Sequence, residues 1–193
     1  MLEQLLQLDR DILIFLNNLG SEKYDFLWLI ITKQANWTPF FLLLAFLIYK
    51  KSGWKNLLLI IVFVAALLTV GNEIVEASKQ HFQRLRPCNN VDINTLLRVV
   101  KPSKSFSFFS GHATNSISAM LFLFLILKKH YRYAYLVFLY PLIFAYSRIY
   151  LGVHYPTDIL TGYAFGAALG YLFYCGYCYV NKKYFLNYNN FSA

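Results

Sequence analysis

Two histidines and one aspartate are the residues of this sequence best suited to catalysis. His154 precedes Asp158 by four positions, and His112 directly follows a Ser-Gly pair. An imidazole attacks phosphorus through one ring nitrogen only when an acceptor holds the proton on the other nitrogen. Residues four apart at the start of a helix share a face, so the Asp158 carboxylate can orient His154. The alternative for Asp158 is a cap or dipole partner of the helix N-terminus.

Several separated donors could hold the phosphate on which this histidine would act. Lys79, Arg86 and Arg148 supply positive charge, and Ser110 with the Gly111 amide adds donors at a predicted helix N-terminus. An arginine fork bonds two oxygens at once, whereas lysine acts as a point charge. Phosphoryl transfer spreads negative charge over three oxygens and is catalysed mainly by positioned donors. These residues therefore predict a phosphate pocket.

His112 is the candidate general acid, which would protonate the leaving oxygen and then activate water. The alternative is an interfacial or packed histidine, but the adjacent Ser110 favours the catalytic role. His81 and His130 have no such neighbours and are predicted to be surface residues. Arg84 lies close to the basic motif, where it would touch a substrate headgroup or anchor the chain at the membrane interface.

In their order and spacing, these residues resemble the type 2 phosphatidic acid phosphatase superfamily. Its pattern is K-x6-RP, then PSGH, then SR-x5-H-x3-D, and the matching stretches here are 79–87, 109–112 and 147–158, with ten of eleven positions identical. The departure is Phe109, where the family usually has a proline that would preset the backbone at this turn. The resemblance covers residues 72–170. It implies a six-helix membrane architecture, a phosphohistidine intermediate on His154, and no cofactor.

The composition indicates that a membrane surrounds the chain. Of the 193 residues, 58% are hydrophobic and 19% are aromatic, and the mean hydropathy is +0.44. A helix needs roughly 20 apolar residues to cross the hydrocarbon core, and the blocks 57–78, 111–127, 133–150 and 159–180 approach or exceed that length. Residues 24–49 add one or two more. We therefore expect one all-α domain, a polytopic membrane helix bundle of about six core helices, five or six of them spanning.

Residues 1–35 are expected to form an amphipathic, interfacial N-terminal segment, and whether this region adds a full span is left open. Leucines and isoleucines gather broadly on one side of the helix predicted over 1–20, while Glu3, Asp9, Arg10 and Asp11 interrupt any spanning run. This pattern is typical of an amphipathic helix that lies in the interface. With no basic region before an apolar core, it does not resemble a cleavable signal peptide.

Proline and glycine positions predict local features of the later spans. Pro141 falls inside the block 133–150 and should kink it. Gly162, Gly166 and Gly170 recur every four residues on one face of the last span, which would let a neighbouring helix approach closely.

Basic residues in the connections predict the orientation in the membrane. They cluster at 50–55, 128–132 and 182–183, which are alternate connections and so share one side. The positive-inside rule makes that side cytoplasmic. The motifs then face outward, toward the periplasm if the membrane is a bacterial inner membrane. The basic residues between 79 and 104 lie against this rule, and the phosphate pocket is the local reason for them.

Other functional classes fit the sequence poorly. The formal charge is +9, but the basic residues separate hydrophobic blocks instead of covering a soluble domain, which argues against nucleic-acid binding. Cys88, Cys175 and Cys178 are odd in number, with no second pair at zinc spacing, so no metal site is expected. Cys175 and Cys178 are interpreted as small packing residues of an apolar helix.

The sequence thus predicts a metal-independent phosphatase whose partners are a phosphorylated lipid and the bilayer. Undecaprenyl diphosphate is favoured because the site is expected to face outward, while phosphatidylglycerophosphate, phosphatidate and lipid A phosphates offer the same chemistry. Headgroup selection is assigned to residues 98–104 and the N-terminal segment. Asn72, Glu73 and Glu76 either line the pocket or bind a neighbouring helix. The alternative of another class is a non-catalytic lipid transporter or scaffold, which would not need two histidines and an aspartate. The oligomeric state is left open.

Overall fold

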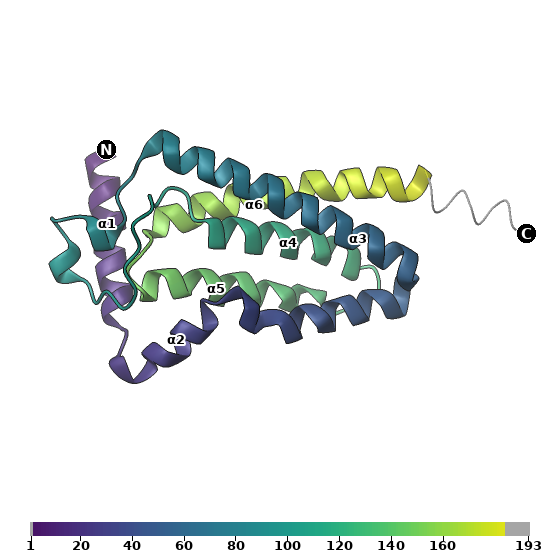
Figure 1. Cartoon of the computed structure of the whole chain (residues 1–193), viewed down its shortest axis with the longest axis horizontal. Helices are drawn as coiled ribbons and strands as arrows, with labels where there is room; N and C mark the ends of the chain where they lie inside the picture. Colours follow the sequence, from purple (N-terminus) through teal and green to yellow (C-terminus); the bar gives the residue numbers. More distant parts are fainter. Residues whose placement is uncertain (1, 184–193) are drawn as a thin grey trace, which may run out of the picture.

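The computed structural model describes residues 2–183, and this part of the chain is helical with no strand (Figure 1). Four helices run along the long axis: α3 (Thr38–Phe82), α4 (Gly111–Leu127), α5 (Leu139–Tyr150) and α6 (Pro156–Asn181). Two others, α1 (Leu2–Asn18) and α2 (Asp25–Ile31), lie at one end. Short 3-10 turns are η1 (Glu22–Tyr24), η2 (Gln34–Trp37), η3 (Pro87–Asn89), η4 (Asn94–Leu96) and η5 (Ala134–Phe138). The predicted all-α architecture is confirmed.

Helix α3 is a hairpin of two helical halves. Gly53 breaks it with φ 73° and ψ 173°, and the chain doubles back at this point (Figure 1). A side chain at Gly53 would meet nothing within 4 Å, so the positive φ, which glycine adopts at little cost, is what requires this residue. The blocks 39–49 and 57–78 are therefore two separate helices.

The number of membrane crossings stays a prediction. Within residues 2–183, length and composition alone select two stretches able to cross a membrane, Gln34–Asn89 and Pro156–Asn181, while Gly111–Leu127 and Ala134–Tyr150 are shorter apolar helices. Helix α2 has seven residues and spans only about 10 Å, too short for a bilayer. Of residues 24–49, the part from Thr38 onward, in the first half of α3, is therefore the candidate for a crossing helix.

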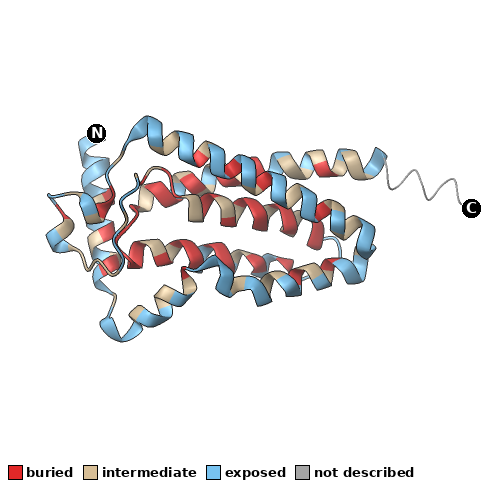
Figure 2. Ribbon diagram, in the orientation of Figure 1, coloured by how far each residue is buried: buried red, intermediate tan, exposed pale blue. Residues whose placement is uncertain are grey.

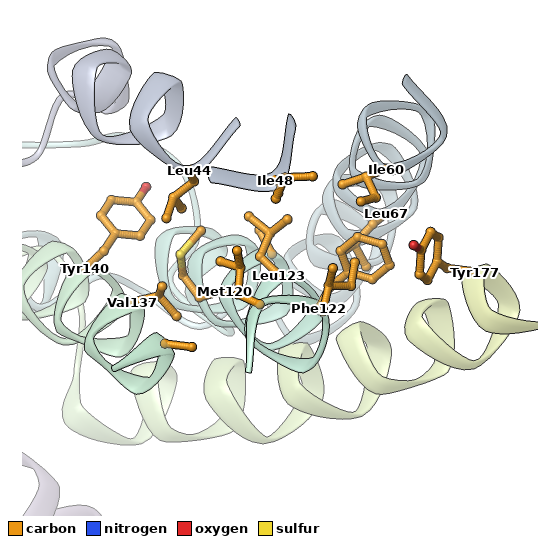
Figure 3. Close-up of a cluster of buried hydrophobic side chains, with 14 of the residues drawn as sticks. Leu44, Ile48, Ile60, Leu67, Met120, Phe122, Leu123, Val137, Tyr140 and Tyr177 are labelled. Carbon is orange, nitrogen blue, oxygen red and sulfur yellow. The ribbon is translucent and has the colours of Figure 1, made fainter. Parts of the chain in front are cut away.

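The core lies between α4 and the helices around it (Figure 2). Leu44 from the first half of α3, Leu67 from the second half, and Met120 and Phe122 of α4 pack in one cluster (Figure 3). Because lipid tails are as apolar as leucine, such a cluster stabilises the bundle through close packing rather than through water exclusion. The outward faces of α3, α5 and α6 also expose large apolar side chains, as lipid-facing surfaces do. Examples are Leu42, Leu43, Phe46, Leu58, Ile61, Leu142, Leu160 and Leu172.

The glycine stripe of α6 packs against α4, as the sequence predicted. A Cβ atom at Gly162 would lie 2.9 Å from the Ser110 carbonyl oxygen, and one at Gly170 would lie 2.5 Å from that of Ser118. At Gly166 the nearest atom would be the carbonyl oxygen of Thr114. Only glycine permits this approach, which brings the starts of α4 and α6 together.

The segment 133–150 changes helix type instead of kinking within one continuous helix. The 3-10 turn η5 ends at Phe138, and α5 begins at Leu139, so Pro141 lies in the first turn of the α-helix. A proline there leaves few intrahelical hydrogen bonds unmade because the first N–H groups have no partner within the helix.

Helix α1 crosses the end of the bundle, roughly perpendicular to the other helices (Figure 1). Its outward face exposes apolar side chains, namely Leu5, Leu6, Leu8, Ile12 and Phe15. Its inward face is partly polar, because Asp9 and Asn17 are buried on either side of Leu13. The sequence predicted an amphipathic helix, but Asp9 was read only as an interruption of the apolar face. In the structure its carboxylate points into the protein.

The connections alternate between the two ends of the bundle (Figure 1). The turn at Gly53, the α4–η5 connection and the end of α6 lie at one end, and these carry the basic clusters noted above. Residues 83–110 and 151–155 lie at the other end, beside α1 and α2. The three motifs therefore share one end.

Candidate active site

Arg86 joins the first and third motifs. This side chain is buried, with its Nη1 atom 3.0 Å from His154 Nε2 and 2.9 Å from the Val153 carbonyl oxygen. Its Nε and Nη2 atoms donate to the carbonyl and hydroxyl oxygens of Ser105 at 2.8 and 2.9 Å. Contacts with two loops thereby hold the guanidinium against the Nε2 atom of His154.

Asp158 serves both roles considered from the sequence. Its Oδ2 atom lies 3.3 Å from His154 Nδ1 and accepts from the Tyr155 amide at 3.0 Å. The first contact orients the imidazole, and the second caps the N-terminus of α6. Because one carboxylate oxygen does both, the start of the helix sets the position of the ring.

The contacts of His154 determine its tautomer. A guanidinium can only donate, so Nε2 of His154 must accept and the ring proton must sit on Nδ1, facing Asp158. The pKa of His154 is lowered to about 4, mainly by burial, and Arg86 and Arg148 contribute to the lowering while the hydrogen bond with Asp158 opposes it. The imidazole is therefore neutral at pH 7, with a lone pair on Nε2.

Thr32, just after α2, connects Arg148 with His112. Arg148 Nη1 donates to the Thr32 hydroxyl at 2.8 Å, and His112 Nε2 lies 3.4 Å from the Thr32 carbonyl oxygen. The His112 ring stacks on Phe144 with centroids 4.6 Å apart. The Nε atom of Arg148 is buried without a hydrogen-bond partner in the described structure. A bound anion would satisfy such a donor.

A backbone hydrogen bond fixes the second motif, residues 109–112, to the third, residues 147–158. The Ser110 amide donates to the Asp158 carbonyl oxygen at 3.0 Å, and the Ser110 hydroxyl accepts from the Ala113 amide at 3.4 Å as the cap of α4. The amide of Ser110 is thus already engaged, whereas its hydroxyl proton is still available to a ligand. Gly111 lies next to it in the first turn of α4, where N–H groups favour an anion.

A cavity of about 940 Å³ begins beside these residues and runs between the two halves of α3 and helix α4. Its polar wall includes Lys79, Gly111 and His112, and its remaining wall is mostly apolar, with Leu44, Ile60, Met120 and Leu123 among the lining residues. The cavity therefore joins a charged end to an apolar chamber of the kind that accommodates a lipid chain.

The polar residues whose role the sequence left open lie on the wall of this cavity. Asn72, Glu73 and Glu76 all line it, and Asn72 also accepts a hydrogen bond from Asn115 of α4 at 2.6 Å. Glu76 pairs with Lys79 at 3.5 Å. Asn72 therefore both lines the pocket and binds the neighbouring helix.

Two other arginines at this end are held by acidic residues of the N-terminal segment. Arg84 pairs with Asp9 and with Asp158, each at 2.7 Å. Arg98, included among the expected headgroup-selecting residues, pairs with Asp25 at 2.6 Å and its guanidinium lies over the Tyr150 ring, which fastens α2 to the loop. Asp9 and Thr32 were missed from the sequence because no local pattern links them to residues so distant along the chain.

The site residues thus form three connected sets. In the first set, hydrogen bonds join Arg86, His154, Asp158 and Ser110. In the second set, Thr32 contacts both Arg148 and His112. In the third set, His112, Gly111 and Lys79 line the same cavity. His81 and His130 are exposed, as predicted. The arrangement offers a neutral, oriented imidazole beside several cationic donors, which suits attack on phosphorus.

Several known proteins are similar to this chain in sequence or in fold. A family model described as the PAP2 superfamily matches residues 56–182. A lipid A 4′-phosphatase of Bacteroides thetaiotaomicron is 30% identical over 178 residues, which cover 90% of this chain and 79% of that protein. An undecaprenyl-diphosphatase of Sulfolobus acidocaldarius is 32% identical over 140 residues, 72% of this chain and 63% of that protein. A transmembrane PAP2-type phosphatidylglycerolphosphate phosphatase from Bacillus subtilis has the same fold, with a TM-score of 0.67 at 20% identity, covering 88% of this chain and 84% of that one.

Proposed function

Because the chain belongs to the PAP2 superfamily and is a membrane lipid phosphatase, we propose that it hydrolyses a phosphate monoester of a lipid A-type glycolipid. The support for this substrate is the similarity to a lipid A 4′-phosphatase, which extends over nine-tenths of the chain. The sequence favoured undecaprenyl diphosphate only through the expected orientation of the site. That lipid remains the second candidate, supported by similarity over a shorter part of the chain.

The observation that carries the proposal is the placement of His154 between Asp158 and Arg86. In the first step, the lone pair on His154 Nε2 attacks phosphorus, a P–N bond forms, and the bond from phosphorus to the lipid oxygen breaks. His112 donates a proton to that oxygen, which leaves as the lipid alcohol. Asp158 stabilises the positive charge that develops on the His154 ring.

In the second step, water attacks the phosphorus of the phosphohistidine. His112, now neutral, accepts a proton from this water, the P–N bond breaks, and inorganic phosphate leaves. Lys79, Arg86 and Arg148, the Gly111 amide and the Ser110 hydroxyl hold the phosphate oxygens through both steps. These donors supply the charge that a divalent cation supplies in many other phosphatases, so the proposed reaction requires no metal.

The cavity gives the lipid part of the substrate a place in this scheme. Its charged end contains His112 and Lys79, and its apolar wall would receive an acyl chain within the bundle. The basic connections at the opposite end of the bundle support a cytoplasmic location for that end. On this basis we place the protein in a bacterial inner membrane with the site facing the periplasm.

The test is phosphate release by the purified protein in detergent from four lipids: lipid A, undecaprenyl diphosphate, phosphatidylglycerophosphate and phosphatidate. We expect the highest kcat/KM with lipid A, unchanged by excess chelator and abolished in His154→Ala. His130→Ala, which alters an exposed histidine at the far end of the bundle, should match the wild type. A preference for undecaprenyl diphosphate would select the second candidate. Loss of activity in chelator would refute the metal-free mechanism, and binding of all four lipids without phosphate release would favour a transporter or scaffold.

A further inference from the structure

We infer that Arg84, held by Asp9 of α1, is a positioning residue that fixes the Asp158 carboxylate against His154. The inference rests on the proposed function of this site and adds to it a chain of paired charges, in which a partly exposed arginine joins two buried carboxylates and reaches the N-terminal helix. Arg84 occupies one of the six positions of the first motif at which the family pattern specifies no residue.

The two oxygens of Asp158 face different partners. Oδ2 faces the His154 ring and the Tyr155 amide, while Oδ1 accepts from Arg84 Nη1 at 2.7 Å. The Asp158 side chain has 0% of its surface exposed, so in the folded protein Oδ1 meets Arg84 and not solvent. Rotation of the carboxylate away from His154 would break its ion pair with Arg84. The arginine therefore restrains the orientation of the group that in turn orients the nucleophile.

Arg84 is itself held on several sides. Its Nη2 atom donates to Asp9 at 2.7 Å, its Nη1 atom donates to the Thr157 hydroxyl at 2.8 Å, and its guanidinium carbon lies 3.9 Å from the centre of the Tyr155 ring. An arginine with both ends of its fork bonded and a ring against its face has little freedom to move. It can therefore transmit the position of Asp9 to Asp158.

Asp9 connects this arrangement to α1. One of its oxygens accepts from the Thr157 amide at 2.9 Å, in the first turn of α6, and the other pairs with Arg84. The side chain thus caps α6 from a separate helix, because the first amides of a helix have no partner within it. The Asp9 side chain is 1% exposed. Removing a charged carboxylate from water costs free energy, which its pairing with Arg84 and the Thr157 amide offsets. Helix α1 therefore completes the support of the catalytic aspartate.

The kinetic test is a double-mutant cycle between Arg84→Gln and Asp158→Asn, with phosphate release from lipid A as the readout. We expect Arg84→Gln alone to lower kcat by roughly 10- to 100-fold, the range that is typical when a residue orienting a metal-ligating side chain is mutated. KM should change by less than about twofold. In the Asp158→Asn background the same substitution should cost less than about twofold, because its effect passes through Asp158. Independent losses that multiply would overturn the inference.

Charge-matched and helix-matched variants separate positioning from misfolding. Arg84→Gln leaves the buried carboxylates of Asp9 and Asp158 without the cation that pairs with both. Adding Asp9→Asn restores the net charge of these three positions. The double variant should therefore fold and still show the low kcat. Asp11→Asn makes the same change at an exposed position of α1 and should match the wild type.

A spectroscopic readout distinguishes failure of this inference from failure of the proposed function. In protein labelled with ¹⁵N-histidine, the His154 resonances, identified by their loss in His154→Ala, should report the Nδ1–H tautomer in every variant that keeps Arg86, because its guanidinium donates to Nε2. Positioning is read from the Nδ1–H proton, whose downfield shift depends on its hydrogen bond with Asp158. We expect this proton to move upfield in Arg84→Gln and in the double variant with Asp9→Asn, and to keep the wild-type shift in Asp11→Asn. An unchanged shift in Arg84→Gln would overturn the role of Arg84 whether or not phosphate is released. Absence of phosphate release with the expected change of shift would overturn the proposed function alone.

Discussion

His154 Nδ1 lies 3.3 Å from Asp158 Oδ2, and both side chains are almost fully shielded from solvent. The two residues belong to different local structures, one in the link after α5 and the other in the first turn of α6. Their contact ties the nucleophile to a helix whose own position is set by its packing on α4. The protonation state of the His154 imidazole therefore depends on its burial as well as on its contact with Asp158.

The first prediction concerns the pH dependence of stability. Burial lowers the pKa of His154 from about 6.5 to about 4, so between these values the unfolded chain binds more protons than the folded protein. The Tm in detergent should therefore fall as the pH is lowered from about 6.5 to about 4. His154→Gln removes this group and should reduce that fall. Equal slopes in the two proteins would contradict the assignment of a neutral, buried imidazole.

The second prediction concerns the cavity. Ala45 lines it from the first half of α3, so Ala45→Phe should occupy space intended for a lipid chain. We expect KM for lipid A to rise by about tenfold, while kcat/KM for a water-soluble aryl phosphate stays within about twofold, because the charged end is unchanged. Ala168→Phe, at an exposed position of α6, is the matched control. An equal loss with both substrates would argue against the cavity as the chain-binding site.

The third prediction concerns the contact between α4 and α6. Gly166→Ala places a Cβ atom against the Thr114 backbone and should destabilise the protein by about 1–3 kcal/mol. Gly176→Ala lies in the same helix, but its nearest neighbour would be Phe63 Cε1 at 3.5 Å, an ordinary contact. It should be neutral or slightly stabilising because alanine is the better helix former. Thermal unfolding in detergent compares the two, and a similar Tm for both would show that α4 and α6 can separate at little cost.

Features governed by local geometry were predictable from the sequence. The four-residue spacing of His154 and Asp158, the cap at Ser110 and the glycine stripe of α6 all follow from the period of a helix, which operates over one or two turns. The apolar blocks likewise indicated helices. A connection between two spans was expected at residues 50–55, but Gly53 was not identified as its turning point, because a glycine in the sequence does not show which φ its backbone adopts.

Contacts between distant segments were decided by the tertiary structure. Arg84 and Asp9 are 75 residues apart, and Arg148 and Thr32 are 116 apart, so no helical period relates them. Arg84 was therefore open between headgroup contact and interface anchoring, and Asp9 was taken as a break in an apolar face. The sequence alone determined which residues could hold and attack a phosphate. Only the packing of α1 and α2 across the end of the bundle decided which side chains support them, because a buried charge takes whichever partner the fold brings within reach.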